Sequence, residues 1–323
     1  MRFSKMETIY LDRNENNYGP APKCLEIARN VSDDLFYRYS TDYKKGIKSI
    51  LSGRLSEDFG IPENRILLGY GAEDLLKQVV QSHLNQGTKL LIPNHSWWYY
   101  KSIADEVDGI TIEYPIVEAE DTYEYDVRRM LELYREHRPR VVLISSPNNP
   151  TGNSLSREDL LRLLEVMQET VVVLDEAYCS FARTHEAPVR ELHERYPHLL
   201  IVRTFSKYYA LAGMRIGYAV MGRGLVRLAQ FSARYLGYHR VSEEIALAAL
   251  DSGDYYRDVA EKMKQDMEMF RRELGSLPGF TVYRSDANFV LVRIPETIRT
   301  DLNTALTERG LIVKFMDEEL LHS

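Results

Sequence analysis

A succession of short apolar runs, alternating with longer amphipathic segments, constrains the fold of this chain more than any other feature of its sequence. The runs are rich in valine, isoleucine and leucine and lie at 65–68, 89–92, 110–112, 141–144, 171–174 and 199–202. Helical patterns precede and separate them, for example at 43–59, 72–84 and 96–107. Continuous apolar runs are typical of parallel strands buried on both faces, and parallel strands need helical crossovers. The sequence therefore predicts an α/β fold with a mostly parallel, mixed sheet covered by helices.

The pattern changes after residue 231, where longer helices and sparser strands begin. We expect helices at 241–250, 254–275 and 298–308, and strands at 280–283, 288–293 and 311–315. These elements indicate a smaller α+β lobe at 232–323, which follows an N-terminal arm at 1–33 and a large domain at 34–231. The arm is rich in turn residues, which favours packing on the small lobe or on a partner chain. No low-complexity linker separates the lobes, so they are expected to share a large interface.

Composition excludes several classes of partner. The 323 residues carry a formal net charge of -7, which offers no cationic face to a nucleic-acid backbone. Cys24 and Cys179 match neither a disulfide framework nor a zinc spacing. The N-terminus is too polar for a signal peptide, and no apolar run approaches the ~20 residues that cross a bilayer. We expect small-molecule partners, no nucleic acid, no membrane, no metal and a cytoplasmic location.

Polar motifs follow three of the predicted strands. Asp175 comes directly after the run 171–174, a turn from Ser146 to Gly152 follows 141–144, and Lys207 stands shortly after 199–202. The carboxyl ends of parallel strands meet at one edge of a sheet, where open α/β folds bind their ligands. A single lysine is usually a solvated surface residue and a single aspartate after a strand is often a helix cap. The combination of the motifs is what predicts a site.

The chemistry of these residues suits an aldehyde cofactor that carries a phosphate. An imine-forming lysine must be partly neutral, and burial or a nearby cation such as Arg215 favours the neutral form of Lys207. A carboxylate such as Asp175 can hold a pyridine nitrogen protonated, raising its pKa by about 1 to 3 units. Tyr178 can donate to a phenolate oxygen, or it can simply pack in the core.

Two further segments offer cofactor contacts. Gly71, Ala72 and Glu73 lie between a strand and a helix, where backbone N–H groups and the positive helix end attract a phosphate. Such glycines often serve only to make the turn. Trp97 and Trp98 offer a flat ring for stacking, although paired aromatics in a helical stretch are more often core residues.

The motifs together resemble those of pyridoxal-phosphate enzymes of fold type I, the aspartate aminotransferase superfamily, and are most similar to its histidinol-phosphate aminotransferase branch. The resemblance extends from Asn14-Glu15-Asn16 to Ala287-Asn288-Phe289. It rests on Asn-Pro-Thr-Gly at 149–152, Asp-x-x-Tyr at 175–178 and Ser-Lys-x7-Arg at 206–215, which are highly specific in this order. It implies pyridoxal 5'-phosphate as the cofactor, bound by the large domain.

The resemblance also implies roles for individual residues. It makes Lys207 the Schiff-base lysine and proton carrier, and Asp175 the partner of the pyridinium nitrogen. The residues implied to bind the ring or the phosphate are Trp97 as the stacking ring, Asn149 and Tyr178 as donors to the ring oxygen, and Thr204, Ser206 and Arg215 beside the turn of Gly71, Ala72 and Glu73 as phosphate ligands. Tyr39 resembles the tyrosine that reaches the phosphate of a partner subunit, which implies a homodimer with shared active sites.

The chain departs from the pattern of this branch at several positions. Asn17 and His95 stand where the branch usually has proline, and Tyr70 where it often has asparagine. The carboxy-terminal strand whose arginine grips an acidic group of the substrate is not matched. We therefore expect that the small domain lacks its usual C-terminal end, or that other residues bind substrate. Tyr18 and Lys314 are the candidates.

The implied reaction is the transfer of an amino group between a small amino acid or phosphorylated amine and a keto acid. A decarboxylase or lyase similar to the threonine-phosphate decarboxylases is an alternative, because the bond that breaks depends on its alignment to the ring rather than on these motifs. A non-catalytic relative is a third possibility.

Overall fold

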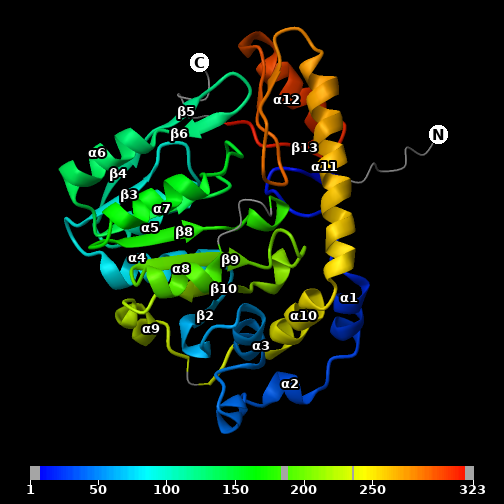
Figure 1. Ribbon diagram of the computed structural model, residues 1–323. Helices are drawn as coiled ribbons and strands as arrows, with labels where there is room; N and C mark the ends of the chain where they lie inside the picture. Colours follow the sequence, from blue (N-terminus) through cyan, green and yellow to red (C-terminus); the bar gives the residue numbers. More distant parts are fainter. Residues whose placement is uncertain (1–7, 183–187, 235, 317–323) are drawn as a thin grey trace.

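The structure of the protein, a computed structural model, describes residues 8–182, 188–234 and 236–316 (Figure 1). Its central sheet contains seven strands in the order β2-β10-β9-β8-β7-β3-β4. The strands are β2 (Ile66–Gly69), β3 (Lys89–Pro93), β4 (Ile110–Tyr114), β7 (Val141–Ser145), β8 (Val171–Asp175), β9 (Leu199–Thr204) and β10 (Gly217–Met221). Strand β10 runs antiparallel to both of its neighbours, β2 and β9, and the other neighbouring pairs in this sheet are parallel. The predicted mostly parallel, mixed sheet is confirmed.

Both faces of the sheet are buried, because successive residues of its strands enter two different apolar clusters. In β7, Val142 and Ile144 pack in one cluster, while Val141 and Leu143 pack in the other. The first cluster is covered by α3 (Ile50–Phe59), α6 (Val127–His137), α7 (Arg157–Val166) and α8 (Val189–Arg195). The second is covered by α4 (Ala72–His83), α5 (Tyr99–Asp105) and α9 (Val226–Phe231). This arrangement explains the continuous apolar runs in the sequence.

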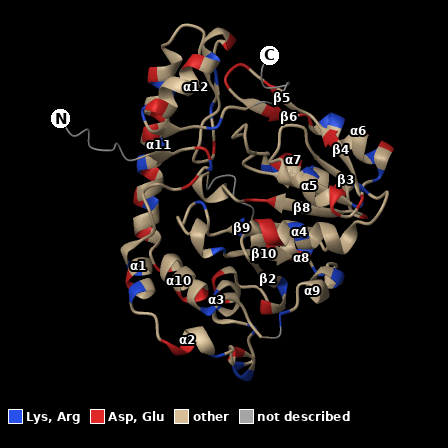
Figure 2. Cartoon of the chain, turned by 180° about the vertical axis from the view of Figure 1, so that it is seen from behind, with Lys and Arg blue, Asp and Glu red and all other residues tan. Residues whose placement is uncertain are grey.

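The C-terminal part of the chain is helical with short strands, as the sequence predicts. Its elements are α10 (Arg240–Leu250), α11 (Gly253–Gly275), β11 (Thr281–Val282), β12 (Val292–Arg293), α12 (Arg299–Glu308) and β13 (Leu311–Ile312). Helix α11 runs along one side of the molecule (Figure 1). Acidic and basic residues are interspersed along it, so it does not present a surface of a single sign (Figure 2).

The N-terminal arm crosses to this C-terminal part. Strand β1 (Ile9–Tyr10) pairs in parallel with β13, with Ile9 opposite Leu311. Helix α1 (Pro22–Arg29) then begins at a proline, whose fixed φ suits the first turn of a helix. The N–H of Ala21 donates to the hydroxyl of Tyr256 in α11 at 3.0 Å, which ties the start of α1 to the long helix.

Three features differ from the sequence-based expectations. The helix expected at 43–59 is wrong in its first part, where the 3-10 turn η1 (Asp42–Lys45) and Gly46, at a φ of 80°, precede the start of α3. Strand β10 was not expected. It is the antiparallel neighbour of β9, and no crossover helix between the two strands signals it in the sequence. The hairpin of β5 (Ile116–Glu118) and β6 (Tyr123–Tyr125) is too short to give a clear alternating pattern.

In the ranges that the structure describes, no helix combines the length and the apolar character that a bilayer span requires. The same residues contain no group of three or more His, Cys, Asp or Glu side chains arranged to hold a metal ion.

Candidate active site

The three motif segments meet at one edge of the central sheet. Ser145, Asp175 and Thr204 are the last residues of β7, β8 and β9, which are neighbours in the sheet. Ser145 lies opposite Asp175 in the pairing of β7 with β8, and Asp175 lies opposite Val202 in the pairing of β8 with β9. Lys207 follows Thr204 by three residues, so the amine and the carboxylate share this edge.

Lys207 lies in a largely buried environment. Its Nζ donates to the carbonyl oxygen of Arg13 at 2.7 Å and lies 5.6 Å from the centre of the Tyr178 ring. The pKa of Lys207 is lowered to about 8, chiefly by burial; the charge of Arg215 contributes to the lowering, while Glu15 and Asp175 oppose it. At that pKa about a tenth of the amine is neutral at pH 7, far more than for a solvated lysine. Lys207 can therefore act as a nucleophile near neutral pH.

Asp175 is buried and receives one hydrogen bond on each carboxylate oxygen. The hydroxyl of Tyr100 donates to Oδ2 at 2.7 Å, and the N–H of Ala177 donates to Oδ1 at 3.0 Å. Burial raises the pKa of Asp175, while both hydrogen bonds and the charge of Lys207 oppose that rise. The two donors fix the carboxylate plane and leave it able to accept a further proton donor.

Tyr100 is a site residue that the sequence analysis did not assign. Its side chain is fully buried, and the nearest signal is its place three residues after Trp97 in the same aromatic run. The Trp97 ring lies edge-on to the Tyr100 ring, with centroids 6.0 Å apart. Trp97 itself is half-buried, just before α5, so it stands one side chain away from Asp175.

The N-terminal arm and the small lobe reach the site at Tyr178. Asn14 Nδ2 donates to the Tyr178 hydroxyl at 3.2 Å, and Asn288 Nδ2 donates to the carbonyl oxygen of Asn14 at 3.1 Å. The Phe289 ring meets the Tyr178 ring edge-on at 5.1 Å. Burial raises the pKa of Tyr178, so its hydroxyl remains a proton donor at neutral pH. The family resemblance extends over Asn14, Asn288 and Phe289, but it implied no role for any of the three.

The Arg215 guanidinium lies at the start of α4. Gly71 precedes the helix at a φ of 84°, which glycine adopts without strain. Arg215 Nη2 lies 3.2 Å from the carbonyl oxygen of Tyr70 and 3.1 Å from Glu73 Oε2. A Cβ on Gly71 would lie only 2.8 Å from Arg215 Nη2. The missing side chain of Gly71 thus lets the guanidinium sit over the positive end of the helix.

Two hydroxyls adjoin the same place. Thr204 Oγ1 donates to Ser206 Oγ at 3.0 Å and accepts from the N–H of Ser206 at 3.1 Å. Gly217 lies opposite Thr204 in the sheet, and a Cβ on Gly217 would lie 2.8 Å from the amide nitrogen of Ala72. Thr204 and Ser206 therefore stand next to the first turn of α4, as the resemblance implies.

The turn of residues 146–152 is tied to the aromatic segment. Asn149 is half-buried in this turn. Its neighbour Asn148 is fully buried, and Asn148 Nδ2 donates to the carbonyl oxygen of His95 at 2.8 Å and to Thr151 Oγ1 at 2.7 Å. These bonds hold the segment of Asn149 and the segment of Trp97 in a fixed relation.

Within the described part of this single chain, the contacts of Lys207 do not involve Tyr18, Tyr39 or Lys314. The Tyr18 hydroxyl donates to Asp266 Oδ2 of α11 at 2.7 Å, and Lys314 is exposed. Tyr39 is 71% exposed. In this chain, then, the lysine site forms without those three side chains.

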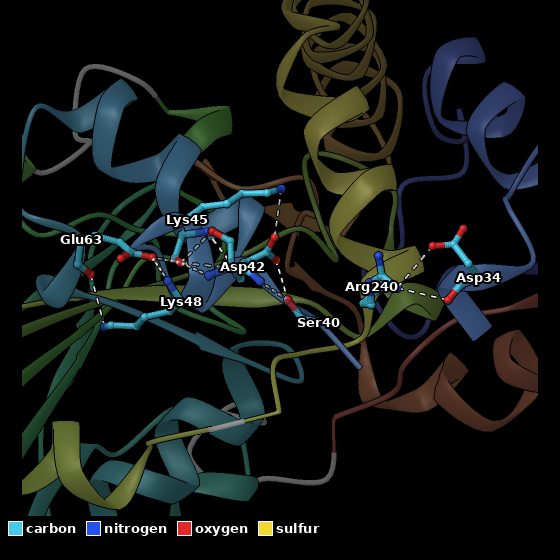
Figure 3. A network of polar contacts seen from close by, with 9 residues as sticks. Asp34, Ser40, Asp42, Lys45, Lys48, Glu63 and Arg240 are labelled. Atoms are coloured by element: carbon cyan, nitrogen blue, oxygen red, sulfur yellow. Dashed lines mark hydrogen bonds and ion pairs between the residues drawn. The ribbon is translucent and has the colours of Figure 1, made fainter. Parts of the chain in front are cut away.

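The segment that carries Tyr39 is anchored nonetheless (Figure 3). Arg240 Nη1 of α10 donates to the carbonyl oxygens of Asp34 at 3.1 Å and Arg38 at 3.4 Å. The polar network of Figure 3 includes Asp34, Ser40, Asp42, Lys45, Lys48, Glu63 and Arg240. Tyr39 is thus an exposed aromatic side chain on a backbone segment that hydrogen bonds fix in place.

Comparison with known proteins assigns the chain to a family. The model of aminotransferase class I and II matches residues 37–316. Histidinol-phosphate aminotransferase 2 of Archaeoglobus fulgidus is 33% identical over 312 residues, which cover 97% of this chain and 85% of that protein. A structure of histidinol-phosphate aminotransferase from Sinorhizobium meliloti in complex with pyridoxal-5'-phosphate superposes with a TM-score of 0.87 at 25% identity, covering 98% of this chain and 84% of the other. The chain belongs to the class I and II aminotransferases.

Within that family the chain is a pyridoxal-phosphate-dependent aminotransferase of fold type I, which confirms the resemblance. The L-threonine-O-3-phosphate decarboxylase of Porphyromonas gingivalis also superposes, with a TM-score of 0.76 at 23% identity over 94% of this chain and 88% of the other. At that identity the likeness concerns the fold alone, so it does not favour the decarboxylase alternative.

The donor set fits the cofactor. The α4 amides, the Arg215 guanidinium and the hydroxyls of Thr204 and Ser206 would hold its phosphate, and the cradle that a Cβ on Gly71 would fill lies among them. Asp175 would meet the ring nitrogen, and Lys207 would bond the aldehyde carbon. These residues combine an amine, an anion and a phosphate site at one sheet edge.

Proposed function

We propose that this chain transfers the amino group of a phosphorylated amine of the histidinol-phosphate type to a keto acid. The observation that supports the substrate class is the 33% identity, over nearly the whole chain, to a protein named for that activity. The observation that supports the chemistry is the Lys207 amine, with its pKa lowered to about 8, at the same sheet edge as the buried Asp175 carboxylate.

In this proposal the chain's own residues divide the work. Bound pyridoxal phosphate supplies an aldehyde and an electron-withdrawing ring. Lys207 Nζ would hold the aldehyde carbon and, when free, would act as the acid and base that moves a proton at the substrate Cα. Asp175 would keep the ring nitrogen protonated. Tyr178 and Asn149 would orient the ring oxygen, and Trp97 would stack on the ring face.

We also propose that the chain works as a homodimer in which Tyr39 reaches the phosphate of the partner subunit. Four aromatic side chains on one anchored segment support this, since Phe36, Tyr37, Tyr39 and Tyr43 are each at least 66% exposed. Exposed aromatic clusters of this kind are enriched at protein interfaces. Tyr18 and Lys314 remain our candidates for substrate contacts, and a cytoplasmic location remains our proposal, supported by cysteines that are buried as thiols.

The function is tested by a half-reaction. Cofactor-loaded protein is mixed with histidinol phosphate, and separately with threonine phosphate and with common amino acids, and the absorbance of the aminated cofactor is followed without an acceptor. We expect the aminated form with histidinol phosphate and none with the Lys207→Ala variant. Amination by other donors alone would reject the substrate assignment, and release of CO₂ from threonine phosphate without amination would favour the decarboxylase.

A further inference from the structure

We propose that Glu118 and Asp121, in the β5–β6 hairpin, are positioning residues that hold the small-lobe segment 284–291 over the lysine site and thereby set the KM for the amine substrate. Neither residue touches the site itself. The proposal rests on the aminotransferase activity, and its test uses any donor that the enzyme accepts.

The segment 284–291 lines the site at three separate places. The Phe289 ring contacts Tyr178 at 5.1 Å, and Asn288 Nδ2 donates to the carbonyl oxygen of Asn14 at 3.1 Å. The N–H of Asp286 donates to the carbonyl oxygen of Gly152 at 2.7 Å. The segment thus contacts the tyrosine, the N-terminal arm and the turn of residues 149–152.

The contact at Gly152 is tight enough to require one placement of the segment. A Cβ on Gly152 would lie 2.4 Å from Ser285 Oγ and 3.0 Å from Ser285 Cα. The N–H of Ala287 donates to Ser285 Oγ at 3.1 Å, which fixes that side chain. A shift of the segment would therefore change the space beside the motif turn directly.

Glu118 holds both strands that flank the segment. Its Oε1 accepts from the Tyr283 hydroxyl at 2.5 Å, and its Oε2 pairs with Arg293 Nη2 at 2.5 Å. Tyr283 directly follows β11, and Arg293 is the last residue of β12. One carboxylate of the large domain therefore joins the two ends of the small-lobe segment.

Asp121 holds the start of the segment from the tip of the hairpin. Its carbonyl oxygen accepts from the N–H of Arg284 at 2.7 Å, and its Oδ2 pairs with Arg271 Nη2 of α11 at 2.6 Å. Arg284 Nη2 lies 3.8 Å from the other carboxylate oxygen. Between the two acids, the Tyr123 and Tyr283 rings pack at 4.9 Å and are both buried.

The strengths of these contacts suit a reversible hold. The Glu118 and Asp121 side chains are 34% and 46% exposed, and ion pairs at such positions are individually weak. A contact of that strength can break and re-form as substrate enters. It still changes, by a few fold, the population in which segment 284–291 contacts the site, which the apparent substrate affinity reports.

The test is a set of surface substitutions that should not disturb folding. We expect Glu118→Gln with Asp121→Asn to raise the KM of the amine donor about threefold to tenfold, with kcat changed less than about twofold. Amide hydrogen exchange at 284–287 should speed up several fold, while exchange in β8 stays the same. The matched control is Glu191→Gln, which breaks the 2.8 Å ion pair to Arg157 on the surface between α7 and α8.

A charge exchange provides the rescue. Arg293→Glu alone should raise KM, and Glu118→Arg combined with Arg293→Glu should restore it at least in part. The proposal is overturned if the double neutral variant keeps the KM and the exchange rates of the parent, or if the control changes KM equally. If the variants aminate the cofactor normally but show no change in KM, only the positioning role of Glu118 and Asp121 is rejected. If the parent protein aminates its cofactor with no donor at all, the aminotransferase activity itself is rejected.

Discussion

The Tyr100 hydroxyl stabilises the negative charge of the site, because it is one of two donors to the Asp175 carboxylate. Both side chains are buried, and the hydrogen bond between them is 2.7 Å long. A hydrogen bond to a buried charge contributes about 1.5 to 3 kcal/mol. Without it the carboxylate is more basic and takes up a proton itself more readily, so Asp175 would be less able to keep a proton on the ring nitrogen of the cofactor.

We therefore expect Tyr100→Phe to lower kcat/KM about tenfold and to weaken cofactor binding. The matched control is Tyr114→Phe, which removes an equally buried hydroxyl that donates to the carbonyl oxygen of Leu143 at 3.1 Å. Steady-state kinetics and cofactor titration measure both variants. Equal losses in the two variants would mean that Tyr100 matters only for folding.

Sequence reasoning could predict the residues of this site that belong to a local motif. Lys207, Asp175 and Tyr178 each follow a strand in a recognisable pattern. Tyr100 and Asn14 gave no such signal, because their contacts join positions 75 and 164 residues apart. Such contacts depend on how the strands and the arm are arranged in space, which no short pattern encodes.

Among the elements, the first turn of α4 depends on the absence of a side chain at Gly71. We expect Gly71→Ala to weaken binding of pyridoxal phosphate at least tenfold, because the added methyl would displace Arg215 and strain a φ of 84°. Binding of pyridoxal, which has no phosphate, should change little. Gly46→Ala is the control, since Gly46 has a φ of 80° but open space around its Cα. Equal weakening of both ligands would reject a phosphate role.

Helix α10 carries a buried acid, Glu243, against the start of α3. Burial raises its pKa from 4.5 to about 7, opposed by a hydrogen bond from Ser49. Among the residues that the structure describes, Glu243 Oε1 has no hydrogen-bond partner. The folded chain therefore binds more protons than the unfolded chain between these two pKa values, so this group makes stability fall as pH rises from 4.5 to about 7.

Glu243→Gln should remove this fall in stability with rising pH. We expect the variant to be more stable than the parent by about 1 to 3 kcal/mol at pH 8, with the difference vanishing near pH 4.5. Thermal unfolding at several pH values measures it, and Glu244→Gln on the same helix is the control. A constant difference across pH, or a less stable variant at pH 8, would contradict the assignment.

The sequence was most informative for elements that are buried on both faces. The predicted strands at 141–144 and 171–174 correspond to β7 and β8, with bounds that differ by one residue. Every side chain in these runs is apolar because it packs in one of the two apolar clusters that cover the sheet. Strand β10 and the β5–β6 hairpin were not predicted. The position of β10 depends on its antiparallel pairing with β9, and β5 and β6 are too short to give a clear pattern.

At the scale of the whole molecule, segments far apart in the sequence pair with each other: β1, in the N-terminal arm, pairs with β13, in the C-terminal part. Ile9 pairs with Leu311, and the arm then passes Arg13 and Asn14 over the site. The sequence indicated a polar arm that packs on a surface, but the choice of β13 follows from the three-dimensional arrangement of the small lobe. The proposed dimer adds a second chain to this assembly.

The dimer proposal predicts complementation between two defective chains. Lys207→Ala should be inactive, and Tyr39→Phe should be weakened about tenfold by loss of a phosphate hydrogen bond. In a 1:1 mixture that has exchanged subunits, about a quarter of the sites would combine an intact Lys207 with the partner's intact tyrosine, as two-fold symmetry requires. Activity with the parent's KM should return to that extent. A mixture that shows only the activity of Tyr39→Phe would exclude a shared site.

The most direct test of the central claim is peptide mapping after borohydride reduction of the cofactor-loaded protein. Reduction converts the reversible carbon–nitrogen double bond into a stable one, so the cofactor stays on the side chain that held it. We predict a single pyridoxyl label, on the peptide that contains Lys207. A label on another lysine, or a protein that takes up the cofactor but carries no label, would contradict the account.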